Sequence, residues 1–231
     1  MTDFILSGPV TGAETPESAV VFFHGFGANG QDLAGLSSVL TPMFPKTAFY
    51  FPDAPDTVPG MPFFNARQWF ALDDFMRDVA VGKDLNAIYA GMLPDALKAA
   101  ETTRRFVAEV RKKHGLPAFK TVVAGFSQGG LMALLTALTD KERCAGVVGL
   151  SACGLAFEKN VFEPENVLSK PPVVLIHGTA DPVVPFDTVS FNRKNLQACG
   201  IDADVFAADG MEHGIDARAL QKLTETLGKF F

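Results

Sequence analysis

The hydrophobic positions of this chain fall into short continuous runs, without the polar alternation of a sheet that faces water. Such runs predict strands that are buried on both faces. The predicted strands are residues 4–6 (a short edge strand), 19–23, 48–51, 121–124, 147–150, 173–176 and 203–207. Helices are predicted between them over residues 31–40, 93–114, 131–138, 185–198 and 216–231. This alternation predicts an α/β fold with a mainly parallel central sheet and helices on both faces.

Composition narrows the class of protein. The 231 residues suit a single domain spanning 1–231, and the net charge of −6 includes no basic stripe, so nucleic acid is not an expected partner. The cysteines Cys144, Cys153 and Cys199 are odd in number and fit a reducing compartment, and Cys153 is expected to be a small buried core residue. The first residues resemble no signal peptide, and no apolar run has membrane-spanning length, so a cytoplasmic protein is expected.

The strongest chemical signal is the turn between the predicted strand 121–124 and the predicted helix 131–138. There Gly125 and Gly129 flank Ser127 in the pattern G-x-S-x-G. This pattern is typical of a nucleophile elbow, a sharp strand-to-helix turn that exposes a serine hydroxyl. The glycines remove side chains that would clash in the turn, and the following helix directs its N-terminus at the site. The turn therefore predicts a serine nucleophile.

A second glycine turn follows the strand 19–23. Gly25, Gly27 and Gly30 form G-x-G-x-x-G before a predicted helix, and Asp53 lies near the end of the next strand. This arrangement suits an NAD-binding oxidoreductase. It equally suits a hydrolase, in which an upstream glycine loop lends a backbone N–H to an oxyanion hole. The motif alone leaves both readings open.

A serine nucleophile needs a base, and four histidines are available. His114 ends a helix beside lysines, where a solvated cation is expected, whereas His24 and His177 each end a strand and suit framework roles. His213 follows the last predicted strand and precedes the last helix. This is the position at which a hydrolase of this layout carries its base, so His213 is the predicted base.

The base in turn needs a carboxylate that orients it. Asp181 lies in the loop after the preceding strand and is the first candidate, with Asp209 second and Asp187 expected to be a first-turn helix acid. The resulting chain order of Ser127, Asp181 and His213 is the order of an α/β-hydrolase.

At this point the chain resembles the phospholipase/carboxylesterase family of α/β-hydrolases, which includes the acyl-protein thioesterases. The matching segments are 23–27, 52–55, 69–70, 125–130, 150–151, 177–185 and 210–213. The resemblance implies Ser127 as nucleophile, His213 as base and Asp181 as orienting acid. It also implies that the backbone N–H groups of Phe26 and Gln128 form the oxyanion hole.

The chemistry implied is hydrolysis of a carboxylic ester or thioester through an acyl-enzyme, with no metal and no organic cofactor. The substrate would be a small ester, an acyl-thioester or an acylated protein, and the sequence leaves a homodimer open. Two alternatives belong to other classes: the NAD-binding oxidoreductase built on the Gly25 loop, and a non-catalytic binding protein with a hydrolase fold.

The segment 59–72 bears on substrate choice. It is rich in apolar side chains and contains several helix breakers, so it is either a loop folded permanently onto the core or a flap over Ser127. We favour the flap, and the resemblance implies that Trp69 contacts the acyl chain, with Phe70 and Phe64 as further substrate-binding candidates.

Overall fold

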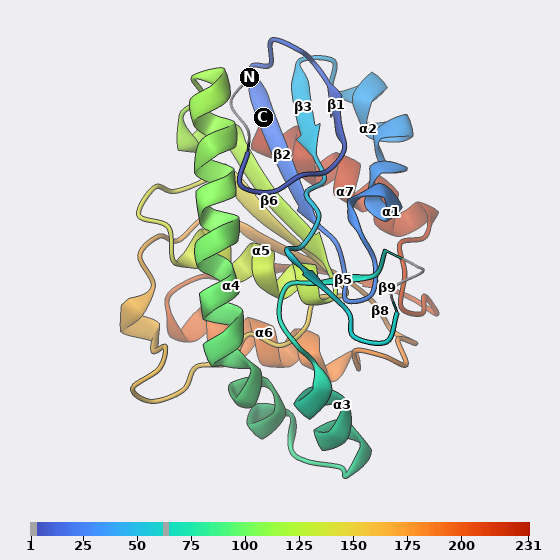
Figure 1. Cartoon of the computed structure of the whole chain (residues 1–231), viewed down its shortest axis with the longest axis vertical. Helices are drawn as coiled ribbons and strands as arrows, with labels where there is room; N and C mark the ends of the chain where they lie inside the picture. The colour runs from blue at the N-terminus through green and yellow to red at the C-terminus, as the bar shows by residue number, and fades with distance from the viewer. Residues whose placement is uncertain (1–3, 62–64) are drawn as a thin grey trace.

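The computed structural model describes residues 4–61 and 65–231 and centres on a seven-stranded sheet in the order β1-β3-β2-β6-β7-β8-β9 (Figure 1). Edge strand β1 pairs antiparallel with β3, and every other pairing is parallel. The strands are β1 (Val10–Gly12), β2 (Ser18–Phe23), β3 (Thr47–Tyr50), β6 (Thr121–Phe126), β7 (Gly146–Leu150), β8 (Val173–Gly178) and β9 (Asp204–Ala208). The predicted mainly parallel sheet is confirmed.

Helices cover both faces of this sheet, because the strands are apolar on both. Along β2, Val21 and Phe23 enter one core cluster, while Val20 and Phe22 enter the other. The first cluster is closed by α4 (Leu85–His114), α5 (Gln128–Leu138) and α6 (Asp187–Ala198), and the second by α1 (Gly30–Ala34), α2 (Ser37–Met43) and α7 (Ala217–Phe230). Figure 1 shows α4 and α5 in front of the strands and α7 behind them.

The register of the parallel strands gathers their carboxyl ends at one edge. Phe23 of β2 lies opposite Gly125 of β6, and Phe126 lies opposite Leu150 of β7. Further along the same sheet, Gly178 ends β8 opposite Ala208 of β9. The loops that leave β2, β6, β8 and β9 therefore converge, and ligands of such sheets bind where these loops meet.

The predicted edge strand 4–6 is wrong. An edge strand does form nearby, but it is β1, which pairs Val10 with Tyr50. The apolar residues before it serve the core instead: Leu6 is buried, and the Phe4 ring lies 5.4 Å from the Phe106 ring. Apolar character at 4–6 thus reports packing and not strand pairing.

Two predicted helices differ most from the observed bounds. The helix 31–40 is two helices, α1 and α2, which meet at Gly35, and the Ser37 hydroxyl donates to the carbonyl of Ala34 at the break. The helix predicted from residue 93 begins at Leu85, because the Asp84 carboxylate caps its first turn, and Pro94 lies inside it. A proline such as Pro94 is common in the first turn of a helix, but here α4 tolerates it in its interior, with the loss of the one hydrogen bond that a proline removes.

Three short elements between residues 53 and 84 were not predicted, and the first two lie in or border the breaker-rich stretch 53–68. They are β4 (Asp56–Thr57), its antiparallel partner β5 (Arg67–Gln68) and α3 (Asp73–Ala80), which packs against α4. Within the described ranges, no helix combines the length and the apolar character needed to cross a membrane.

Candidate active site

Ser127 occupies a strained turn between β6 and α5. Its φ of 56° and ψ of −118° lie outside the regions that ordinary residues favour. A Cβ on Gly125 would lie 2.0 Å from the carbonyl oxygen of Gly129, and one on Gly129 would lie 2.1 Å from that of Phe23. Only glycine fits at both positions. Ser127 is the N-cap of α5, yet its side chain makes no capping hydrogen bond, so the helix does not occupy its hydroxyl.

The predicted acid and base meet beside this turn. His213 Nδ1 lies 2.7 Å from Asp181 Oδ2, and the other carboxylate oxygen accepts the backbone N–H groups of Val183 and Val184 at 2.9 Å each. Burial by itself would raise the pKa of Asp181, but the hydrogen bonds from His213 and from the two amides outweigh it and lower that pKa. The carboxylate is therefore ionised at neutral pH and accepts the proton on Nδ1 of the imidazole.

The other two candidate acids lie elsewhere. Asp209 is exposed and accepts a hydrogen bond from the Thr179 hydroxyl at 3.3 Å, which joins the loop after β9 to the loop after β8. Asp187 is the first residue of α6, as expected for a first-turn acid. Among the described acidic residues, Asp181 is the one that bonds His213.

The elbow and the histidine are neighbours. The ring of Phe126, which directly precedes Ser127, lies 4.7 Å from the His213 ring. Behind the serine, Cys153 donates its backbone N–H to the Ser127 carbonyl at 3.1 Å. Burial raises the pKa of the Cys153 thiol to about 12, partly opposed by the adjacent Ser127 hydroxyl, so the thiol stays protonated. Cys153 belongs to the buried core, as predicted, but its contact with the serine had no signal in the sequence.

The two expected oxyanion donors border the same point. A Cβ placed on Gly25 would lie 3.4 Å from the Cβ of Ser127, so the glycine loop that carries Phe26 abuts the serine. Gln128 opens α5, where the helix dipole favours negative charge. Within the described chain, neither backbone N–H has an acceptor. The arrangement thus offers two free amides beside the candidate nucleophile.

The side chain of Gln128 joins this turn to the segment after β5. Its Oε1 accepts the Trp69 backbone N–H at 3.1 Å, and its Nε2 donates to the Phe70 carbonyl at 2.8 Å. The Trp69 indole N–H then donates to the His24 carbonyl at 2.9 Å. Gln128 is fully buried, so these bonds are shielded from water. Only the backbone role of Gln128 could be expected from the sequence, because the partners of its side chain, Trp69 and Phe70, lie far away along the chain.

A second connection runs from the same segment to the glycine loop. Gly27 N–H donates to the Arg67 carbonyl, and Arg67 N–H donates to the Ala28 carbonyl, both at 2.9 Å. Residues 67–70 therefore brace both halves of the expected oxyanion hole. We call residues 67–70 the brace.

The other histidines are framework residues, as predicted for two of them. His24 Nδ1 donates to the Gly25 carbonyl, and its Nε2 accepts the Ala54 N–H. His177 Nε2 lies 2.9 Å from the Val184 carbonyl. His114 differs from the expectation of a solvated cation: it lies 2.6 Å from the Tyr50 hydroxyl, and burial followed by the Lys113 charge lowers its pKa.

The glycine loop does not offer a dinucleotide site. Asn29 and Asp32 form a capping box at the N-terminus of α1. The N–H of Gly30 donates to Asp53 at 2.8 Å, so the acid assigned to a ribose already bonds the loop. The amides at the N-terminus of α1, where a pyrophosphate would bind, are thus occupied by the protein, and the oxidoreductase alternative is not favoured.

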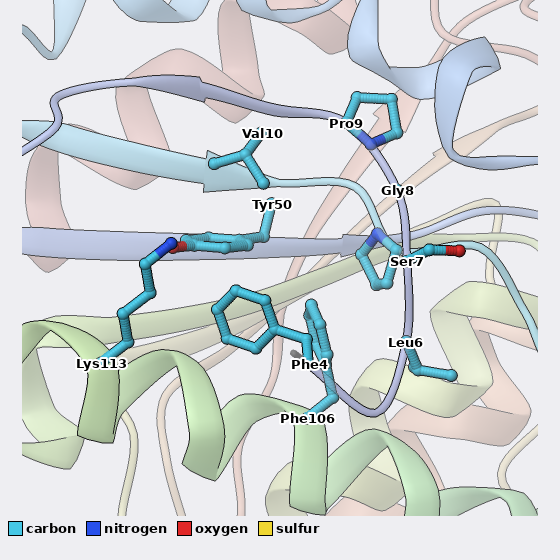
Figure 2. A pocket seen from close by; sticks show the side chains of 10 residues that line it. Phe4, Leu6, Ser7, Gly8, Pro9, Val10, Tyr50, Phe106 and Lys113 are labelled. Atoms are coloured by element: carbon cyan, nitrogen blue, oxygen red, sulfur yellow. The ribbon is translucent and has the colours of Figure 1, made fainter. Parts of the chain in front are cut away.

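The candidate substrate-binding aromatics are mostly buried. Trp69 and Phe70 are 2% and 4% exposed and line a cavity of about 260 Å³ with residues of α4. Phe64 lies outside the described residues. A separate cavity of about 500 Å³ lies between the N-terminal segment and α4, where Figure 2 shows Phe4 and Phe106 beside Tyr50. Of the predicted site residues that the structure describes, none lines that second cavity.

Known proteins resemble the chain over nearly its whole length. A family model described as phospholipase/carboxylesterase matches residues 10–231. Acyl-protein thioesterase 1 of Cryptococcus neoformans is 31% identical over 199 residues, covering 81% of this chain and 76% of that protein. The Neurospora crassa acyl-protein thioesterase 1 is 28% identical over 223 residues, covering 91% and 85%. The crystal structure of esterase PE8 matches with a TM-score of 0.84 at 32% identity, covering 98% and 99%.

Proposed function

Because the chain belongs to the phospholipase/carboxylesterase family of α/β-hydrolases, we propose that it hydrolyses carboxylic esters or thioesters through an acyl-enzyme on Ser127. The observation that carries this proposal is the 2.7 Å hydrogen bond between His213 and Asp181, formed beside a serine held in a strained elbow. The same bond argues against a non-catalytic binding protein, for which a buried, ionised acid that orients a histidine would have no use.

The imidazole tautomer defines the first step. Since Nδ1–H of His213 donates to Asp181, the lone pair lies on Nε2. Ser127 Oγ attacks the substrate carbonyl carbon, and its proton passes to Nε2. Asp181 holds the ring in place and stabilises the imidazolium that forms. The carbonyl oxygen becomes an oxyanion, which the N–H groups of Phe26 and Gln128 stabilise at the dipole of α5.

The second step returns the enzyme to its starting state. The tetrahedral intermediate collapses, the bond to the leaving group breaks, and the imidazolium gives its proton to the leaving oxygen or sulfur. A water molecule then gives a proton to His213 and attacks the acyl-enzyme, which releases the acid and restores Ser127. No metal or organic cofactor takes part in either step.

The acyl group is the less defined half of the substrate. We keep Trp69 and Phe70, with Phe64, as the candidate acyl contacts and residues 59–72 as the candidate flap. Because Trp69 and Phe70 are buried and bonded to Gln128, they act in this proposal as a fixed wall of the acyl site. The similarity to acyl-protein thioesterases supports acylated proteins as substrates beside small esters. We further propose a single-domain protein of the cytoplasm, able to form a homodimer.

A serine-directed fluorophosphonate probe tests the proposal. We expect it to label one site, which peptide mapping assigns to Ser127, and we expect labelling to abolish hydrolysis of p-nitrophenyl butyrate. Esters from acetate to octanoate, compared between wild type and Trp69→Phe, then test the acyl contact: wild type should prefer medium chains, and the variant should show a flatter profile. An unlabelled protein without esterase activity would refute the proposed function.

A further inference from the structure

A cavity of about 400 Å³ opens beside His213 and extends toward α1 and α2. Its apolar lining consists of Leu33, Leu36, Phe126 and Ile215. Leu36 and Ile215 are partly exposed, so the cavity is open to a ligand from solvent. Trp69 and Phe70, the described aromatics among those assigned to the acyl chain, do not line it.

This cavity begins at the reacting groups. His213 and Gly25 both line it, and Gly25 is the residue whose missing Cβ would lie 3.4 Å from the Ser127 Cβ. The Phe126 ring, 4.7 Å from the His213 ring, forms the wall next to the elbow. A substrate bonded to Ser127 therefore has direct access to the cavity along the His213 side.

The reaction itself decides which half of the substrate lies there. When the tetrahedral intermediate collapses, the bonding electron pair moves to the leaving oxygen or sulfur, which takes the proton from His213. The leaving atom must therefore lie within hydrogen-bond reach of that imidazole. We propose that the cavity, here named the leaving-group cleft, binds the alcohol or thiol half of the substrate; this inference rests on the proposed function.

The lining also selects the chemical class of the leaving group. Most of its side chains are apolar, and the acid among them is Asp32, whose carboxylate accepts the Asn29 N–H at 2.8 Å. Of the described residues that line the cleft, none is lysine or arginine. A phosphate-bearing leaving group would meet a like charge and no cation, whereas an alkyl alcohol or thiol would bury apolar surface. The cleft thus selects neutral, apolar leaving groups.

Esters with one acyl group and different alcohols isolate this cleft. For butyrate esters of methanol to hexanol, kcat/KM reports acylation, while deacylation of the butyryl-enzyme is common to the whole series. We expect kcat/KM to rise by up to about fourfold per methylene until the cleft is filled. Leu36→Trp should fill the cleft and flatten that rise. Val39→Trp, on the exposed side of the same helix, is the matched control and should keep it.

The charge preference has its own test with thioesters. We expect butyryl-coenzyme A to be hydrolysed at least tenfold more slowly, in kcat/KM, than the S-hexyl ester of thiobutyric acid. Asp32→Asn should narrow this difference several-fold, because it removes the charge and keeps an oxygen for the Asn29 N–H. The matched control is Asp202→Asn, which removes an exposed charge next to Arg193.

The inference and the proposed function fail in different ways. If the fluorophosphonate probe labels Ser127 and methyl butyrate is hydrolysed, but kcat/KM is independent of the alcohol, the leaving-group cleft is overturned and the proposed function stands. The cleft is equally overturned if Leu36→Trp changes the profile for acyl length in p-nitrophenyl esters and leaves the alcohol profile intact. Absence of both labelling and hydrolysis removes the proposed function and the inference together.

Discussion

Two glycine-rich turns in this molecule join a parallel strand to a helix, and only one of them leaves the N-terminus of its helix open. At the turn before α1, Asn29 caps the Gln31 N–H, and Asp53 takes the N–H of Gly30. At the turn before α5, Ser127 is the N-cap but makes no capping bond, and the N–H of Gln128 has no acceptor among the described groups. The sequence patterns are alike, so the chemical difference lies in whether side chains of the protein already satisfy the helix amides.

The matched replacement of the two N-cap residues should have the largest effect. Ser127→Ala should lower kcat by on the order of 10⁶-fold, the loss known for a serine nucleophile in a triad enzyme. Its stability should change little, because glycines set the elbow and the hydroxyl caps nothing. Asn29→Ala should do the reverse, losing about 1 kcal/mol of unfolding free energy with kcat almost unchanged.

Hydrolysis of p-nitrophenyl butyrate gives kcat for both variants, and urea denaturation gives their free energies of unfolding. Near-normal turnover by pure Ser127→Ala protein would contradict the assignment of the nucleophile. A similar loss of activity in both variants would show that the two turns do not differ in the way described.

The next largest difference is expected between replacements of the two acids, Asp181 beside the turn before α5 and Asp53 beside the turn before α1. Asp181→Asn should lower kcat by on the order of 10⁴-fold, because the amide favours the wrong imidazole tautomer. Asp53→Asn should mainly cost stability, by about 1 kcal/mol, since it weakens the charge-assisted bond to Gly30. Asp209→Asn is the exposed control. A crippling effect of Asp209→Asn with an active Asp181→Asn would require a different triad.

The parallel strands and the glycine elbow could be predicted from the sequence, because each is a local pattern. Gly125 and Gly129 mark their turn, and the positions of Asp181 and His213 after successive strands follow from parallel topology. The brace could not be predicted. Gln128 and Trp69 are 59 residues apart, and no periodicity records which buried amide meets which backbone group.

Other differences have equally physical origins. The helix predicted from residue 93 starts eight residues earlier, because the Asp84 carboxylate caps the helix at Leu85 and Pro94 does not interrupt it. His114 was expected to be charged, but its environment is set by Tyr50, a residue of a distant strand. Tertiary contacts of this kind override local signals and become visible only in the folded chain.

The brace yields a smaller effect with a distinct kinetic signature. Gln128→Leu keeps the backbone N–H of residue 128 but leaves the Trp69 N–H and the Phe70 carbonyl unpaired. Loss of a whole oxyanion donor costs about 10²-fold to 10³-fold in kcat, so misplacement should cost about tenfold to a hundredfold. We expect KM to change little, because the brace acts on the transition state.

Trp69→Phe is the companion variant: it removes the indole donor to His24 together with part of the ring and keeps both Gln128 bonds, so it should have a milder effect on kcat. Both variants require thermal melts beside the kinetics, to separate misplacement from unfolding. A folded Gln128→Leu protein with wild-type kcat would remove the brace from the catalytic machinery.

The smallest expected effect concerns the turn before α1 and is a change in how the free energy of unfolding depends on pH. Burial is the main cause that lowers the pKa of His24, whose Nε2 must stay unprotonated to accept the Ala54 N–H. The unfolded chain therefore binds more protons than the folded chain as pH falls below about 6.5, the ordinary histidine pKa, so stability is greatest above that pH and decreases below it. One such group can contribute a slope of at most about 1.4 kcal/mol per pH unit.

His24→Gln retains an amide donor and acceptor without the titration, and urea denaturation at pH 7, 6 and 5 should give a shallower loss of stability than in wild type. His177 and His114, whose pKa values are also lowered, keep part of the slope in both proteins. An identical slope in wild type and His24→Gln would mean that His24 accepts a proton in the folded state as readily as in the unfolded chain, and that the glycine turn is less tightly closed than its hydrogen bonds indicate.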